Sequence, residues 1–267
     1  MIAVSVQNPE EGLPEHPDFT GAAAVPVANY RNITAFNTSV PLTDLTGPTG
    51  QLAQFGAAHS TADPNALYTI WIGSNDLIDI LAGAAPSQYA ADIGAAVTNV
   101  DTAIGTLAGG GAKNFLIVTV PDLGMTPQAI AGGPAAQAAA SALAVGFNNA
   151  LVNSAVTFAS LDSLNLSILN TYSLLDAIVA NPSIYGFTNV TDPCLTGAVN
   201  YVGGTACAAT TAAQNQYLLW DLRHPTAAGH AIIADAALAV VTPEPASVSL
   251  IAAGLVAIGL AFRLRRV

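Results

Sequence analysis

Apolar and polar positions along the chain follow two alternating patterns. Short and nearly continuous apolar runs occur at residues 67–73, 114–120, 165–172 and 216–220. Runs of this length, bounded by turn residues, are typical of strands buried on both faces of a sheet. Ala-rich segments with helical spacing lie between or after them, at residues 87–111, 135–159, 173–181 and 224–241. The alternation predicts an α/β fold, with a mainly parallel sheet covered by helices on both faces.

The first 60 residues lack this alternation. They are rich in Pro, Asn, Thr and Gly, and they show little periodicity. Only the opening "MIAVSV" has the pattern of a strand, and the rest predicts loop. The chain contains no internal repeat and no linker before residue 242.

Composition and charge narrow the class of protein. Apolar residues make up 52% of the 267 residues and charged residues only 9%, which excludes an intrinsically disordered chain. Three of the six basic residues lie in the last five positions, so residues 1–262 carry a formal charge of −14. A surface this acidic repels phosphate backbones, and we expect no nucleic-acid partner.

The two cysteines, Cys194 and Cys207, flank a Gly-rich stretch. They form no Cys/His cluster with zinc spacing. Two interpretations stay open: a pair of buried thiols, or a disulfide formed in an oxidising compartment. The disulfide is favoured, because the end of the chain also indicates export.

The C-terminal segment predicts a membrane helix. Residues 246–262 carry no charge and are followed by three arginines within four residues. Seventeen helical residues reach about 26 Å, the short end of the spanning range, and a basic end predicts a cytoplasmic C-terminus. An ordinary buried helix is the alternative.

Pro243, Glu244 and Pro245 precede this helix, and the arrangement resembles the PEP-CTERM sorting signal of Gram-negative bacteria. That resemblance implies export, transient anchoring and processing by an exosortase.

Two polar islands follow strand-like runs and carry the candidate chemistry. In "DLRHPT", Asp221 precedes His224 by three residues, a spacing that lets the carboxylate hold one ring nitrogen and orient the other. The alternative is a helix cap followed by a loop histidine. His230, further along, is interpreted as a helix residue packed on the sheet.

The second island is "GSND", which follows residues 67–72. Gly73 permits a tight turn, and Asn75 offers a neutral amide donor suited to an oxyanion. Asp76 could cap the next helix. Each island alone is also explained by ordinary turn chemistry. Both fall directly after strands, where ligands of parallel sheets bind.

Taken in order, four stretches resemble the GDSL-type lipase/esterase (SGNH hydrolase) family: "ALYTIWIGSNDLIDIL", "NFLIVTVPDLGMTP", "YGFTNVTDPCL" and "YLLWDLRHPTAAGHAIIA". The resemblance implies a three-layer α/β/α sandwich and a Ser-His-Asp triad that hydrolyses esters of lipids or acylated saccharides without a cofactor. His224 matches the general base and Asp221 the residue that orients it. Asn75 matches the oxyanion-hole asparagine, with Gly73 shaping its loop. We therefore expect an N-terminal segment 1–41, a hydrolase domain 42–241 and a sorting signal 242–267.

The nucleophile of the family lies in a Gly-Asp-Ser motif near the N-terminus, and no Gly-Asp-Ser occurs in this chain. Ser5 follows an apolar run, but it lacks the Gly-Asp that precedes the family's serine. Gly21 is a candidate for the second family block. The opening residues also lack the basic and apolar pattern of a secretory leader. The sequence thus suggests a chain shortened at its N-terminus, or a non-catalytic surface protein with the same fold.

A metal-dependent hydrolase is the third hypothesis. It would use Asp76, His224 and His230. The sequence lacks the dense His and carboxylate cluster that such a site needs, so we expect no metal.

Overall fold

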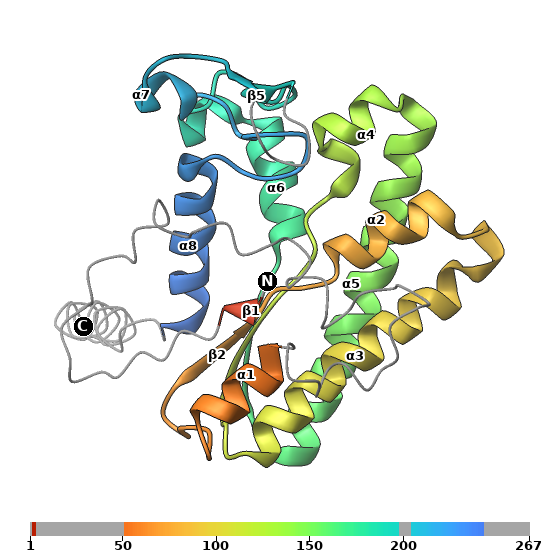
Figure 1. Ribbon diagram of the computed structural model, residues 1–267, viewed down its shortest axis with the longest axis vertical. Helices are drawn as coiled ribbons and strands as arrows, with labels where there is room; N and C mark the ends of the chain where they lie inside the picture. The colour runs from red at the N-terminus through yellow and green to blue at the C-terminus, as the bar shows by residue number, and fades with distance from the viewer. Residues whose placement is uncertain (1, 4–50, 198–203, 243–267) are drawn as a thin grey trace, which may run out of the picture.

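The computed structural model describes residues 2–3, 51–197 and 204–242 (Figure 1). Its main sheet has the strand order β1-β2-β3-β4. Strands β2, β3 and β4 are parallel, and β1 pairs with β2 in the antiparallel sense. Their bounds are Ile2–Ala3, Leu67–Ile70, Asn114–Val118 and Asn165–Leu169. The mainly parallel sheet predicted from the apolar runs is confirmed for three of its four expected strands.

Eight α-helices are described. They are α1 (Gln51–Ala58), α2 (Ser74–Gly83), α3 (Tyr89–Gly109), α4 (Pro127–Ala131), α5 (Pro134–Asp162), α6 (Thr171–Ala180), α7 (Thr211–Gln214) and α8 (Ala227–Val241). Single 3-10 turns occur at Pro86–Gln88, Leu123–Met125 and Pro182–Tyr185, and a small hairpin joins β5 (Leu195–Thr196) to β6 (Thr205–Ala206). The long helices agree with the predicted segments to within three residues at each end.

The two faces of the sheet are covered by different helices, as the alternation of side chains in β3 shows. Phe115 and Ile117 face the main core, which is formed with α1, α2, α3 and α5. Leu116 and Val118 face the opposite side, where they pack with residues of α8. Figure 1 shows α8 on one side of the sheet and α2, α3 and α5 on the other. The predicted three-layer α/β/α sandwich is therefore confirmed.

Helix α5 is long and apolar enough to cross a membrane by length and composition. Its inner face, however, includes Leu143, Phe147 and Leu151, which are fully buried in the main core. We therefore assign α5 as the central helix of the domain. The spanning helix expected at residues 246–262 lies outside the described part of the chain.

The predicted strand at residues 216–220 is wrong. This segment forms isolated bridges, from Tyr217 to Asn189 and from Leu219 to Pro225. Its backbone pairs with a loop, because the N–H of Leu218 donates to the carbonyl of Asn189 at 2.8 Å. Leu218 and Leu219 are buried in a separate apolar cluster with Leu175, Ile178 and Phe187. The apolar run thus indicated burial correctly but not its pairing partner.

Candidate active site

Residues 217–226 form a closed loop ahead of α8. The N–H of Trp220 donates to the carbonyl of His224 at 2.7 Å, and the N–H of Thr226 donates to the carbonyl of Leu218 at 2.9 Å. Thr226 is also the N-cap of α8, where its hydroxyl oxygen accepts the N–H of Gly229. Pro225 precedes this cap, so α8 begins at Ala227, three residues after the start predicted from the sequence. These bonds close the loop on itself, and the cap attaches its end to α8.

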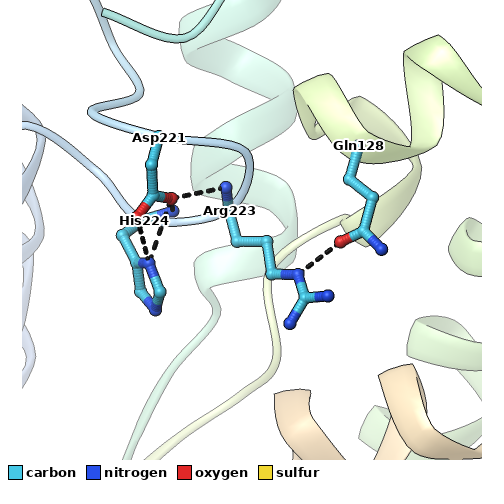
Figure 2. A network of polar contacts seen from close by, with 4 residues as sticks. All are labelled: Gln128, Asp221, Arg223 and His224. Carbon is cyan, nitrogen blue, oxygen red and sulfur yellow. Dashed lines mark hydrogen bonds and ion pairs between the residues drawn. The ribbon is translucent and has the colours of Figure 1, made fainter. Parts of the chain in front are cut away.

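Asp221 and His224 are in direct contact within this loop (Figure 2). Nδ1 of His224 lies 2.8 Å from Oδ2 and 3.0 Å from Oδ1 of Asp221. Oδ1 also accepts the backbone N–H groups of Arg223 and His224, each at 2.8 Å. The Asp221 side chain is 12% exposed, and that of His224 is 56% exposed. A mostly buried carboxylate therefore orients an accessible imidazole.

Opposing effects act on the Asp221 carboxyl group. Burial is the largest, and it raises the pKa because it disfavours the charged form. The hydrogen bond to the His224 ring, the two backbone N–H donors and the charge of His224 act the other way, and together they lower the pKa below its usual 3.8. Asp221 is therefore ionised at neutral pH, which lets it stabilise an imidazolium on His224.

This lowered pKa predicts an acid-sensitive contribution to folding. A carboxyl group whose folded pKa lies below its unfolded value stabilises the protein above the unfolded pKa, and the stabilisation is lost as the pH falls through the folded pKa. We expect the difference in free energy of unfolding between the wild type and Asp221→Asn to shrink as the pH is lowered from 7 to below 3.8. Urea unfolding at each pH measures this difference. Asp235→Asn, at an exposed position of α8, is the control, and a difference independent of pH would contradict the prediction.

A second contact joins the loop to α4. Nε of Arg223 donates to Oε1 of Gln128 (Figure 2), and the backbone N–H of Gln128 donates to the carbonyl of Leu222 at 3.2 Å. Helix α4 follows β3, with a 3-10 turn between them. The Asp221–His224 loop is thereby tied to the segment that leaves the carboxyl end of the sheet.

Cys194 and Cys207 form a disulfide, which closes the β5–β6 hairpin. Cys194 is fully buried, whereas Cys207 is exposed. The hairpin lies against the residues that precede Asp221, because the N–H of Cys194 donates to the carbonyl of Leu219 at 3.0 Å. Of the two interpretations of the cysteine pair, the structure has the disulfide.

Gly73 and Asn75 lie at the start of α2, directly beyond the carboxyl end of β2. Gly73 has φ +114°, a conformation that favours glycine, and it is packed against Phe147. Asn75 is exposed on the first turn. The N-cap position belongs to Gly73, whereas Asp76 is buried in the first turn of the helix, so Asp76 is not the cap residue that the sequence suggested.

The predicted site residues thus fall into two groups. Asp221 and His224 are bonded to each other, while Gly73 and Asn75 occupy the carboxyl edge of the sheet. Among the described residues, no hydrogen bond joins Asn75 to either member of the pair. His230 lies in the first turn of α8 and is exposed, with its ring edge-on to Trp71 at 6.4 Å between centroids. Ser5, Gly21 and the triplet 243–245 lie outside the described residues.

A polar cluster beyond β3 was not found from the sequence. Asp122 is buried, and its Oδ1 accepts the hydroxyl of Ser141 at 2.6 Å and the N–H of Gly124 at 2.8 Å. Burial, followed by the charge and hydrogen bonding of Asp122, raises the pKa of Tyr172 and of Asp176. The only local signal was the Pro-Asp-Leu-Gly turn after the strand, because the other members come from two distant helices.

The third hypothesis from the sequence was a metal site formed by Asp76, His224 and His230. In residues 51–197 and 204–242, no group of three or more His, Cys, Asp or Glu side chains has an arrangement that could hold a metal ion. The trio Asp76, His224 and His230 is therefore not a metal-binding cluster in this part of the chain.

A carboxylate that fixes an accessible imidazole beside a parallel sheet is typical of hydrolases with a nucleophile, a base and an acid. The profile of the GDSL-like Lipase/Acylhydrolase family matches residues 10–237, and the chain belongs to this family. The PEP-CTERM protein-sorting motif matches residues 241–266. The resemblance inferred from the sequence is confirmed on both points.

Relatives of this chain occur in bacteria and plants. A thermolabile hemolysin of Vibrio parahaemolyticus is 28% identical over 179 residues, which cover 64% of this chain and 40% of the relative. A GDSL esterase/lipase of Arabidopsis thaliana is 28% identical over 199 residues, covering 67% of this chain and 53% of the relative. An uncharacterized protein from the trpE-trpG intergenic region of Pseudomonas putida is 33% identical over 189 residues, covering 68% of this chain and 29% of the relative. The chain thus spans about half the length of these relatives, or less.

Proposed function

We propose that the protein is an exported, surface-anchored ester hydrolase whose acid–base pair is Asp221 and His224. The contact between the Asp221 carboxylate and Nδ1 of His224, at 2.8 Å, carries this proposal. With Nδ1 bonded to the carboxylate, Nε2 is the ring nitrogen that exchanges protons with the substrate in the proposed reaction. A bonded Nδ1–H fixes the neutral tautomer in which Nε2 is a base.

The proposed reaction is acyl transfer to a serine, whose position the labelling experiment below would identify, followed by hydrolysis. Nε2 of His224 accepts the proton of the serine hydroxyl while its oxygen bonds to the ester carbonyl carbon, and the imidazolium then protonates the departing alcohol. Water repeats the sequence on the acyl-enzyme and releases the carboxylic acid. The side-chain amide of Asn75 donates to the oxyanion of each tetrahedral intermediate, and Gly73 sets the turn that presents it.

We propose esters of lipids or acylated saccharides as the substrate class. Support comes from the family and from the Arabidopsis thaliana relative, which is named as an esterase/lipase. The arrangement needs no cofactor, because the proposed proton transfers and oxyanion stabilisation are all carried out by side chains of this chain.

The sorting motif supports a proposal for where the protein acts. We propose that it is exported in a Gram-negative bacterium, held in the inner membrane through residues 246–262 with its C-terminus in the cytoplasm, and processed by an exosortase-type enzyme near Pro243–Pro245 on its way to the cell surface. The disulfide agrees with an oxidising compartment.

Hydrolysis of p-nitrophenyl butyrate by the purified full chain tests the proposed activity. We expect turnover that a fluorophosphonate inhibits, and mapping of the labelled peptide identifies the nucleophilic serine. Asn75→Ala should lower kcat by roughly 10²- to 10³-fold, the usual cost of one oxyanion donor. Asn149→Ala, an exposed asparagine on α5, should leave kcat unchanged.

A second candidate function is a non-catalytic binding protein of the cell surface. The observation that favours it is the absence of Gly-Asp-Ser from the sequence. In that case the purified chain would neither turn over p-nitrophenyl butyrate nor take up the fluorophosphonate. Either positive result would exclude this alternative.

A further inference from the structure

The hairpin closed by Cys194–Cys207 lies directly against the backbone that carries Asp221. Two hydrogen bonds join them, from the N–H of Cys194 to the carbonyl of Leu219 at 3.0 Å and from the N–H of Leu195 to the carbonyl of Trp220 at 2.5 Å. A third bond, from the N–H of Cys207 to the carbonyl of Cys194, holds the two halves of the hairpin together. The bonded residues Leu219 and Trp220 immediately precede Asp221 in the chain.

Trp220 links this hairpin to the histidine. Its carbonyl accepts from Leu195 of the hairpin, and its N–H donates to the carbonyl of His224 at 2.7 Å. One residue is thus bonded to the hairpin on one side and to the backbone of the candidate base on the other. A shift of the hairpin would be transmitted to both ends of the Asp221–His224 contact.

The other attachments of the loop lie further along the chain. Leu222 and Arg223 contact Gln128 of α4, and Thr226 is bonded to Leu218 and caps α8. These contacts fix the second half of the loop. The first half is held by the bond from the N–H of Leu218 to the carbonyl of Asn189 and, at Leu219 and Trp220 where the chain turns into Asp221, by the hairpin.

We propose that the Cys194–Cys207 disulfide is a positioning element for the Asp221–His224 pair, so that the pair keeps its bonded geometry only in the oxidised protein. This inference rests on the proposed function, in which the pair is the acid–base device. Opening the cross-link of a loop this short raises the population of its detached state on the order of 100-fold in the chain-entropy model. The hydrolase would then become fully active only after it reaches an oxidising compartment.

The bond is chemically accessible, because Cys207 is exposed although Cys194 is buried. A dithiol such as dithiothreitol gives two electrons and two protons to the disulfide, yielding two protein thiols and a cyclic disulfide of the reagent. Reduction of the folded protein therefore tests the proposal without any substitution. The double variant Cys194→Ser/Cys207→Ser provides an independent second test.

Nuclear magnetic resonance of the histidine rings measures the effect directly. The chain has only four histidines, so the ring nitrogens of the full-length protein can be assigned from His→Gln variants. At pH 8 we expect His224 of the oxidised protein to show the Nδ1–H tautomer with slow proton exchange. After reduction, exchange of this proton should accelerate up to about 100-fold and the tautomer preference should weaken. The ring signals of His59, which stacks on Phe55, should not change.

The outcomes separate the two proposals. Unchanged His224 signals in a protein whose thiols are fully titrated, with His59 also unchanged, would overturn the positioning role whatever the esterase assay gives. Changed His224 signals without any ester turnover would keep the positioning role and reject the proposed activity. If the Cys194→Ser/Cys207→Ser variant does not fold, the reduced wild type still tests the positioning role. Its His59 signals report whether the rest of the domain is intact.

Discussion

Replacing His224 by alanine is expected to lower kcat for p-nitrophenyl butyrate on the order of 10⁶-fold, leaving only the catalysis that oxyanion stabilisation and substrate binding supply. Loss of the base in a catalytic triad has a cost of this size, because the nucleophile is then neither deprotonated nor aligned. The side chain is 56% exposed, so its removal leaves no buried cavity, and the fold should be retained although the Asp221 carboxylate loses a hydrogen bond. Steady-state kinetics together with urea unfolding separate the two effects.

Combining variants sharpens this prediction. Asp221→Asn alone should cost about 10⁴-fold, because the amide favours the wrong tautomer of His224. Added to His224→Ala it should cost little more, since residues that act as one unit show strongly non-additive effects. His59→Gln, at an exposed position after α1, is the control histidine. A His224→Ala enzyme that keeps its activity within tenfold of the wild type would remove this pair from the mechanism.

The regular part of the fold could be predicted from local pattern alone. The apolar runs that became β2, β3 and β4 are bounded by turn residues, and the two long helices have a continuous Ala-rich spacing. Period and length are local properties of a sequence, which is why these elements were found. The first strand, Ile2–Ala3, was indicated by its apolar residues, but its antiparallel pairing with β2 was not.

The segment at 216–220 shows where local pattern fails. Its two leucines are as buried as residues of a strand, but the backbone of this segment bonds to the loop residues Asn189 and Cys194 and to Leu195 of the short strand β5. That pairing depends on the disulfide hairpin and on the apolar cluster beneath it. Neither produces a periodic pattern of apolar residues in the sequence. Pattern could predict that these residues are buried but not which backbone they meet.

The candidate site also has a part that local sequence predicts and a part that only the tertiary structure assembles. Asp221 and His224 are three residues apart, and their contact follows from that spacing. The cluster around Asp122 joins a turn to Ser141 of α5 and to Tyr172 and Asp176 of α6, so only the tertiary structure assembles it. Its one sequence signal was the Pro-Asp-Leu-Gly turn, in which Gly124 has no room for a side chain because an added Cβ would lie 2.1 Å from the Ser141 hydroxyl oxygen.

Gly73→Ala is expected to destabilise the fold by about 3 kcal/mol. A φ of +114° costs an alanine roughly 1–2 kcal/mol, and overpacking adds about 1–3 kcal/mol. The added Cβ would lie 2.4 Å from Cζ of Phe147, which is fully buried on α5, so the aromatic ring has little room to move. Urea unfolding of the full chain measures the change.

Two other glycines separate the causes of this loss. Gly133 has φ +83° and ψ 179° with no atom within 4 Å of an added Cβ, so Gly133→Ala should show a backbone cost alone, about 1–3 kcal/mol. Gly83 ends α2 without positive φ or a close neighbour, and Gly83→Ala should be neutral or stabilise by up to about 1 kcal/mol.

The contact with Phe147 links this glycine to the candidate oxyanion donor. A turn that must move away from Phe147 also displaces Asn75, two residues on, so kcat should fall in Gly73→Ala even at temperatures where the variant is folded. Phe147→Leu, added to Gly73→Ala, makes room for the new methyl group and should recover part of both losses. If the double variant is no more stable and no more active than expected from adding the two single changes, the packing of Gly73 on Phe147 does not set the geometry of this loop.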